Sequence, residues 1–212
     1  IFMVKLYFRY GTVGSAKTLN LLAVAHNYRQ QNKDVLLLKP KLDDRFGQEN
    51  ITSRAGLSIE ADHTICEETF FSFDGKRFLQ KQTNNEKKLI LLKKASLPSC
   101  ILVDECQFLS SEIIEQLWLI TVCCQVPVIL YGLRTNFKGT LFPGVKKIME
   151  RADVIEEVKT TCWFCNRKAT HNLKMNGDKA ISQGPEVELG FEDKYLPTCK
   201  NCYLEKLGFF EN

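Results

Sequence analysis

The sequence predicts an α/β protein whose mostly parallel sheet is flanked by helices. Two observations carry this prediction. Short apolar runs typical of buried strands alternate with helical patterns, and a glycine-rich loop joins the first such run to the first helix. Alternating strands and helices require right-handed crossovers, which produce a parallel sheet. Because ligands of such sheets bind beyond the carboxyl ends of the strands, functional residues are expected directly after each strand.

Each expected element rests on its own pattern. The strand-like runs are residues 6–8, 35–39, 101–104 and 128–131, and the helical patterns are residues 18–31, a less regular 84–95, and 111–123. The last helix is expected to begin at Ser110-Ser111, which offers an N-cap, and to present Ile113, Leu117, Ile120 and Cys124 on one face. Residues 41–61 lack a clear period and are expected to form a partly mobile loop.

Composition excludes several classes of protein. The 212 residues are enough for one α/β domain with a small appendage, and a hydrophobic content of 44% supports a folded core. The net charge of +4 is spread along the chain and does not favour a nucleic-acid surface. The most apolar run, residues 117–133, is interrupted by Gln125 and Pro127, so no membrane span is expected. Nine cysteines, an odd number, without a visible secretory signal favour a cytoplasmic protein over a disulfide framework.

The segment GTVGSAKT, residues 11–18, has the layout of a phosphate-binding P-loop because it follows a strand and opens a helix. Its backbone N–H groups would converge on a phosphate, and the helix N-terminus adds a favourable dipole. Lys17 would reach the β- and γ-phosphates, and the Thr18 hydroxyl would ligate Mg²⁺. The candidate phosphate ligands are Gly11, Thr12, Val13, Gly14, Ser15, Ala16, Lys17 and Thr18. The alternative is a Gly/Ser-rich turn before an ordinary helix.

One residue of this segment departs from the pattern G-x-x-x-x-G-K-[ST]. Ala16 stands where the pattern has glycine. Its methyl group costs little if the local φ is negative and more if φ must be positive.

Two adjacent carboxylates, Asp104 and Glu105, close the buried run 101–104. In P-loop enzymes an acidic residue at this place orients Mg²⁺, and a spare carboxylate can act as a base. Neighbouring side chains on a strand point to opposite faces, so the two residues are expected to have different roles. A strand that ends in a solvated turn is the alternative, but the upstream P-loop favours the functional interpretation.

The sequence changes in character from residue 160, where two C-x-x-C pairs appear. Cys162, Cys165, Cys199 and Cys202 form two pairs separated by 33 residues. Four thiolates held by two tight turns suit a structural Zn²⁺ with no open coordination position. The long spacer indicates a large loop held at its base by metal, and the alternatives are two disulfides or a redox pair. We expect one domain over residues 1–159 and a second over 160–212.

These motifs, in this order, resemble the cytosolic thymidine kinase family that carries a zinc-bound lasso loop. The resemblance covers nearly the whole chain and rests on GTVGSAKT, KPKLDDR (39–45), VDECQF (103–108), YGLRTNFKGTLF (131–142), the four cysteines and EDKYLPTCKNCY (192–203). It implies a RecA-like P-loop kinase domain over residues 1–159 and a zinc-ribbon or lasso domain over residues 160–212.

The resemblance also implies roles for individual residues. Glu105 matches the general base that takes the proton from the nucleoside 5′-hydroxyl. Asp43 and Arg45 match residues that arrange metal and phosphates, so Thr18, Asp43 and Asp104 are the implied magnesium ligands. The implied nucleoside pocket consists of Val13, Phe108, Leu133, Phe137, Phe142, Val187 and Tyr195, with Asn172 as a weaker candidate. Val13 stands where many members have Met, which leaves acceptance of deoxyuridine open.

The expected function is ATP-dependent phosphorylation of thymidine to dTMP in pyrimidine nucleotide salvage. The resemblance further implies a homotetramer and feedback inhibition by dTTP. The alternative function is a P-loop ATPase whose zinc ribbon acts on nucleic acid. Against this alternative, the segment between the cysteine pairs carries the acidic residues Glu186, Glu188, Glu192 and Asp193, and no basic patch with interleaved aromatic residues lies near the cysteines. A zinc-stapled nucleotide sensor is a third, non-enzymatic alternative.

Overall fold

The structure is a computed structural model, and it describes residues 4–43, 47, 49–74, 76, 77, 89–184 and 195–210. Its centre is a six-stranded parallel sheet with the strand order β11–β1–β10–β9–β2–β5. The strands are β1 (Leu6–Tyr10), β2 (Val35–Pro40), β5 (His63–Ile65), β9 (Cys100–Val103), β10 (Val128–Gly132) and β11 (Val154–Glu157). The sheet and its flanking helices confirm the predicted α/β class.

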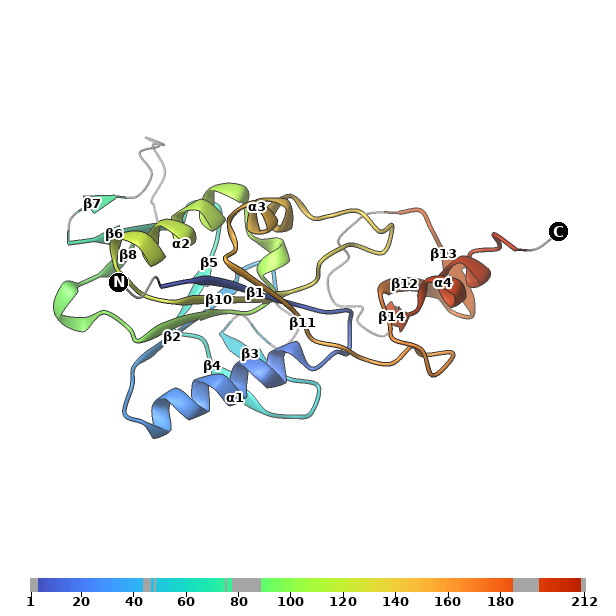
Figure 1. Cartoon of the computed structure of the whole chain (residues 1–212), viewed down its shortest axis with the longest axis horizontal. Coiled ribbons are helices and arrows are strands. Elements are labelled where there is room, and N and C mark those ends of the chain that lie inside the picture. The colour runs from blue at the N-terminus through green and yellow to red at the C-terminus, as the bar shows by residue number, and fades with distance from the viewer. Residues whose placement is uncertain are drawn as a thin grey trace.

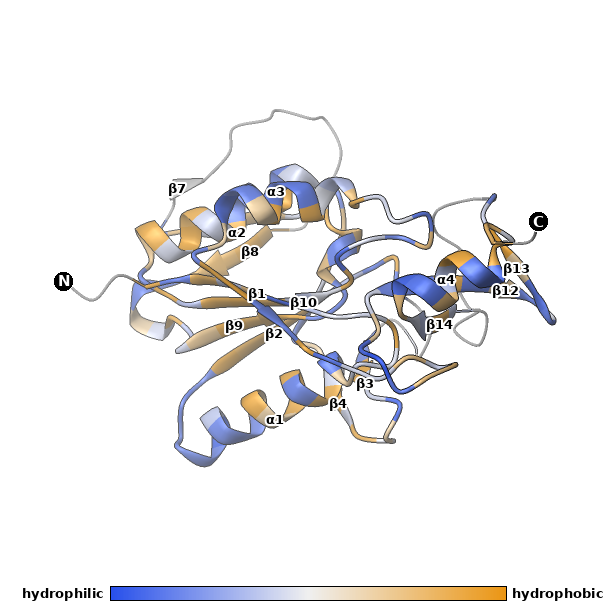
Figure 2. Ribbon diagram, turned by 45° about the vertical axis from the view of Figure 1, so that its right-hand side comes forward, coloured by the Kyte–Doolittle hydropathy of each residue, from blue (hydrophilic) through white to orange (hydrophobic). Residues whose placement is uncertain are grey.

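Helices cover both faces of this sheet (Figure 1). Helix α1 (Lys17–Gln30) lies on one face, and α2 (Ser111–Cys123) and α3 (Pro143–Arg151) lie on the other. Successive residues of a strand pack on opposite faces of the sheet. Leu37 packs in the hydrophobic cluster on the α1 face, whereas Leu38 packs in the cluster on the face of α2 and α3. The two innermost strands, β9 and β10, are therefore continuously apolar, because parallel sheets are buried on both sides (Figure 2).

Smaller elements surround the main sheet. Strands β3 (Asn50–Thr52) and β4 (Ser58–Glu60) form an antiparallel hairpin, and β6 (Phe70–Phe73), β7 (Lys76–Arg77) and β8 (Leu89–Leu92) form a three-stranded sheet. Short 3₁₀ helices cover Lys94–Ser96 and Cys106–Phe108. Among the described residues, no helix has both the length and the apolar character needed to cross a membrane.

We use "C-terminal segment" for residues 160–184 and 195–210. It holds an antiparallel sheet of β13 (Lys179–Ile181), β12 (His171–Asn176) and β14 (Tyr195–Thr198), followed by α4 (Lys200–Lys206). Figure 1 shows this segment beyond one end of the main sheet. That end carries the carboxyl termini of the parallel strands, because β1 leads there into the P-loop and α1.

Most sequence-based element predictions are confirmed, and two are wrong. All four predicted strands form, and the Ser110 hydroxyl caps α2 by accepting from the Ile113 N–H at 3.3 Å. The helix expected over 84–95 does not form in its described part, where β8 and a 3₁₀ turn lie instead, because Leu89–Leu92 pairs with β6. The loop expected over 41–61 contains the β3–β4 hairpin, in which Ile51 opposes Ile59.

Candidate active site

The loop between β1 and α1 is shaped by close backbone contacts. A Cβ atom on Gly11 would come within 2.3 Å of the Ser15 Oγ and 2.5 Å of the Val158 carbonyl oxygen, so only glycine fits. The Ser15 N–H donates to the Thr12 carbonyl at 3.3 Å and closes the turn. The buried Lys17 ammonium donates to the same Thr12 carbonyl at 2.8 Å and to the Ser15 Oγ at 3.4 Å. These contacts hold the ammonium group inside the loop.

Ala16, the departure from the glycine pattern, has a left-handed backbone with φ 61° and ψ 27°. The local φ is therefore positive, which costs a residue with a Cβ atom about 1–2 kcal/mol. Ala16 is also the N-cap of α1 and provides no side-chain acceptor for the first amides of the helix. Amides at such a helix start favour an anionic ligand.

The two carboxylates after β9 have different partners. Asp104 is buried, and its Oδ2 accepts from the Thr18 hydroxyl at 3.0 Å, which ties the end of β9 to the start of α1. Glu105 accepts from the Gln107 amide at 2.5 Å, and the Gln107 Oε1 in turn accepts from the Leu133 N–H at 3.0 Å. The Glu105 backbone is left-handed, with φ 47°, a strained conformation that often occurs at functional sites.

A cavity of about 390 Å³ joins these features. Its walls come from residues 13–19 of the P-loop and the start of α1, from residues 52–55 at the tip of the β3–β4 hairpin, and from Glu105 and Leu133. The structure therefore brings Lys17, Thr18 and Glu105 to one cavity, as a single phosphate site requires.

Asp43 is buried but does not belong to the described lining of this cavity. Its carboxylate lies 3.4 Å from the ammonium of Lys39, which is itself only 1% exposed. Lys39 also donates to the carbonyls of Gly47 and Asn50 at 3.1 and 2.8 Å, so it anchors the chain after β2. Arg45, the other residue implied by this motif, lies outside the described residues.

The predicted nucleoside residues fall into two groups. Leu133 and Val13 line the cavity, and Phe108 packs edge-on against Phe142, with 6.1 Å between the ring centres. Phe142 belongs to the buried core cluster on the α2–α3 face, so it also has the packing role of a core residue.

The second group lies at the C-terminal segment. The rings of Phe137 and Tyr195 lie 6.2 Å apart, and the buried Lys174 ammonium sits 4.8 Å from the Phe137 ring centre. These contacts bring Phe137, a predicted pocket residue between β10 and α3, next to Tyr195, a predicted pocket residue of the C-terminal segment. Val187 lies outside the described residues.

Asn172 on β12 connects the C-terminal segment to the P-loop. Its side-chain oxygen accepts from the Val13 N–H at 2.9 Å, and its side-chain amide donates to the Thr135 carbonyl at 3.0 Å. Asn172 is only 4% exposed, so both bonds are partly shielded from water. The weakest of the pocket candidates is thus a structural bridge between three parts of the chain.

The four cysteines of the two C-x-x-C pairs form a cluster in which all sulfur atoms lie within 4.8 Å of one another. The Cys165 sulfur is 3.7 Å from that of Cys199 and 3.8 Å from that of Cys202. Zinc–sulfur bonds of about 2.3 Å in a tetrahedron place sulfur atoms about 3.8 Å apart. The separations fit zinc, whereas disulfides do not form, since all nine cysteines are free.

The pKa values of two thiols in this cluster are shifted in opposite directions. Burial raises the pKa of Cys162, but N–H groups of Cys199, Phe164 and Cys165 outweigh it and lower the pKa to about 7. Burial and the neighbouring thiols raise the pKa of Cys202 to about 12. Four thiolates at this spacing repel one another, and a divalent cation at their centre removes that cost.

The cysteine cluster is linked to the predicted pocket. Tyr203 follows Cys202 directly, and its hydroxyl donates to the Phe137 carbonyl at 2.6 Å. Its ring also stacks on His171, with 4.8 Å between the ring centres. The turn that carries two metal-binding thiols therefore supports one wall of the predicted nucleoside pocket.

Two residues of this site carry no role in the sequence-based expectations. Gln107 orients Glu105, and the motif VDECQF contains the signal that could have found it. Arg54 lines the cavity from the hairpin tip, and no local pattern marks it.

Comparisons with known proteins agree with this site. A family model described as thymidine kinase matches residues 4–203. The chain is 37% identical over 202 residues to the thymidine kinase of Lactiplantibacillus plantarum, covering 95% of this chain and 96% of the relative. It is 38% identical to the thymidine kinases of Listeria monocytogenes, over 202 residues (95% and 97% covered), and of Haemophilus influenzae, over 207 residues (97% and 99%). The alternative of a nucleic-acid ATPase finds no support in these matches. The chain therefore belongs to the thymidine kinase family.

Proposed function

We propose that the protein transfers the γ-phosphoryl group of ATP to the 5′-hydroxyl of thymidine, giving ADP and dTMP. The observation that carries this proposal is the cavity that holds the P-loop and Glu105 together. Family membership supports thymidine as the acceptor. The same membership supports a cytoplasmic homotetramer inhibited by dTTP, and these properties belong to the proposal as well.

The P-loop side of the cavity would bind the triphosphate. The loop amides and the Lys17 ammonium would hold the phosphates, and Thr18 and Asp104, already hydrogen-bonded, would hold Mg²⁺. Asp43 and Arg45 complete the proposed phosphate and magnesium set. Bound Mg²⁺ supplies positive charge to the phosphate oxygens during transfer. Because the loop is already closed by internal hydrogen bonds, these donors need little rearrangement to stabilise the transferring group.

Glu105 would act as the general base. Its carboxylate takes the proton of the 5′-hydroxyl while that oxygen forms the new bond to the γ-phosphorus and the bond to the ADP oxygen breaks. Gln107 holds the carboxylate through its amide and is itself fixed by the Leu133 N–H. This connection keeps the base in one orientation beside a residue proposed to contact the nucleoside.

The C-terminal segment would close over the base of the nucleoside. We assign the contacts to Val13, Phe108, Leu133, Phe137, Phe142, Val187 and Tyr195. Apolar and aromatic walls hold a flat pyrimidine and exclude water from the reaction. Zn²⁺ at the four cysteines would be structural, because a closed set of four thiolates leaves no position for substrate. We place the boundary between the two domains at residues 159 and 160.

A Glu105→Gln variant tests the proposal because it keeps the shape of the side chain and removes the base. We expect thymidine affinity, measured by calorimetry, to stay within about threefold of the wild-type value. Thymidine-dependent ADP release should fall about 10²- to 10⁴-fold. Glu150→Gln, an exposed carboxylate on α3, is the matched control and should retain activity. Wild-type turnover in Glu105→Gln would remove Glu105 from the base role, and a wild-type protein that ignores thymidine would overturn the function.

A further inference from the structure

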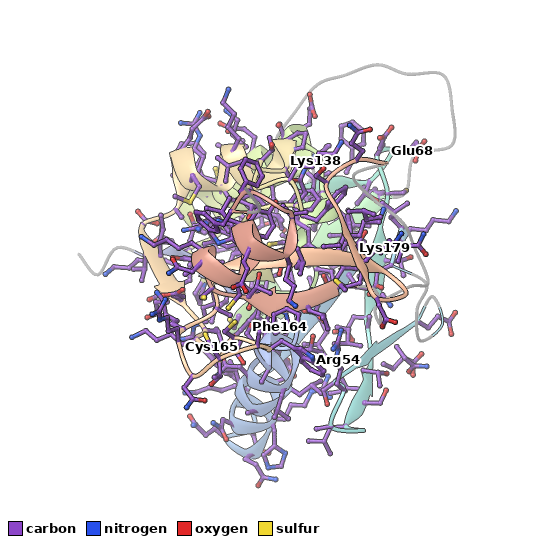
Figure 3. The ribbon with its side chains drawn as sticks, turned by 90° about the vertical axis from the view of Figure 1, so that its right-hand side faces the viewer. Arg54, Glu68, Lys138, Phe164, Cys165 and Lys179 are labelled. Atoms are coloured by element: carbon purple, nitrogen blue, oxygen red, sulfur yellow. The ribbon has the colours of Figure 1, made fainter. Side chains whose placement is uncertain are left out.

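A cation outside the P-loop enters the proposed phosphate cavity. Arg54 lies at the tip of the β3–β4 hairpin and lines the cavity together with Lys17. Its Nη1 atom is 3.9 Å from the position that a Cβ atom would occupy on Gly14. In Figure 3, which faces the end of the molecule that carries the C-terminal segment, the Arg54 side chain is seen below the ribbon of that segment. The guanidinium group therefore lies over the middle of the loop, on a chain segment separate from it.

The hairpin tip that carries Arg54 is internally fixed. The Ser53 N–H donates to the Leu57 carbonyl at 2.8 Å, and the Gly56 N–H donates to the Ser53 carbonyl at 3.0 Å. The Ser53 hydroxyl accepts from the Leu57 N–H at 3.2 Å, and Gly56 adopts φ +84°, which the tight turn requires. Arg54 thus projects from a defined turn, which limits the entropy lost when its side chain binds a ligand.

The hairpin is also fixed relative to the P-loop. Ile51 is 2% exposed and packs in one cluster with Leu21, Leu22 and Ala25 of α1. At the base of the hairpin, the buried Lys39 ammonium holds the Asn50 carbonyl at 2.8 Å. Since α1 begins at the P-loop, the same helix positions the loop amides below the cavity and the hairpin beside it.

We propose that Arg54 binds the phosphate chain of the nucleotide on the side opposite to the loop amides, as a clamp supplied by the same chain. The proposal rests on the triphosphate site proposed above. Gly14 has no side chain, so a phosphate on the loop amides stays open to the guanidinium group. The planar fork of arginine matches two phosphate oxygens at once, which a lysine ammonium cannot do.

Calorimetric binding to the full chain tests the clamp with Arg54→Gln and Arg54→Lys. The probes are AMP, ADP, a non-hydrolysable ATP analogue with Mg²⁺, and thymidine. A charge-assisted hydrogen bond predicts that Arg54→Gln lowers affinity for the ATP analogue about 10- to 100-fold, with AMP and thymidine changed less than about threefold. Arg54→Lys should recover part of the loss. Arg29→Gln removes the same charge from the exposed last turn of α1 and should change nothing.

The outcomes separate this proposal from the function on which it rests. Wild-type affinity of Arg54→Gln for the ATP analogue would overturn the clamp and leave the kinase proposal intact. Equal losses for thymidine, AMP and the ATP analogue would also overturn it, because they indicate a structural role for Arg54. A wild-type protein that binds no ATP analogue would overturn both.

Discussion

The two halves of the proposed site are stabilised in different ways. The P-loop half rests on a six-stranded sheet whose two faces are packed with aliphatic side chains from three helices. In the described C-terminal segment the buried apolar residues are only Cys162, Ala169, Leu173, Pro197 and Cys199, and two of these belong to the thiol cluster. A segment this small has little hydrophobic burial to stabilise it, and metal binding at the four cysteines would add to its stability. We therefore expect the nucleotide half to be preformed and the proposed nucleoside half to depend on a metal at the four cysteines.

Removal of zinc should have the largest effect and should separate the two halves. A structural zinc site contributes about 10 kcal/mol or more to the folding of the segment that holds it. We therefore expect a chelator, or the variant Cys162→Ser, to lower thymidine affinity by more than about 100-fold while ATP-analogue affinity stays within about threefold. Zinc content by atomic absorption and calorimetry measure these quantities. Cys123→Ser, an exposed cysteine outside the cluster, is the control. An equal loss of affinity for thymidine and for the ATP analogue would refute the proposed independence of the two halves.

Asn172→Ala should have an intermediate effect because this residue joins the halves. The variant leaves the Val13 N–H and the Thr135 carbonyl without their partner in a partly buried place. We expect the free energy of unfolding in urea to fall by about 1–3 kcal/mol. As in zinc removal, the affinity for thymidine should fall more than the affinity for the ATP analogue, but by a smaller factor. Asn176→Ala, at the exposed end of the same strand, should be near neutral; a similar loss there would argue against the bridge.

Ala16→Gly should have the smallest effect, confined to the P-loop half. Glycine relieves the strain of the positive φ, which costs the folded protein about 1–2 kcal/mol. It also increases the conformational entropy of the unfolded chain, which destabilises the folded state by about 0.4–1 kcal/mol. We expect a net gain of roughly 0.5–1 kcal/mol in the free energy of unfolding, with the zinc content unchanged. Ala23→Gly, at an exposed interior position of α1, should instead lose about 1 kcal/mol. Destabilisation by both substitutions would contradict a strained Ala16.

Sequence patterns predicted the features that depend on neighbours along the chain. The strands of the main sheet follow from apolar runs, the P-loop from its spacing, and the cysteine cluster from two C-x-x-C pairs. The β3–β4 hairpin escaped prediction because its strands carry few apolar residues, chiefly Ile51 and Ile59, too few to show a period.

Several site contacts depend on residues far apart in the sequence, and no local pattern records them. Asn172 meets Val13 across 159 positions, and Arg54 reaches Gly14 from a separate hairpin. The resemblance of whole motifs implied the pocket, yet it ranked Asn172 last among the candidates. The roles of Arg45 and Val187, outside the described residues, and the domain boundary at residue 159 stay predictions.

The hydrogen bond from Tyr203 to the Phe137 carbonyl leads to an expectation about cells that lack zinc. Tyr203 follows Cys202 of the cysteine cluster directly, so loss of a bound ion would release Phe137, which we propose to face the pyrimidine. We expect protein made in zinc-starved cells to keep its affinity for ATP but to lose its selectivity among nucleosides. Growth on salvaged thymidine would then depend on how well the cell acquires zinc.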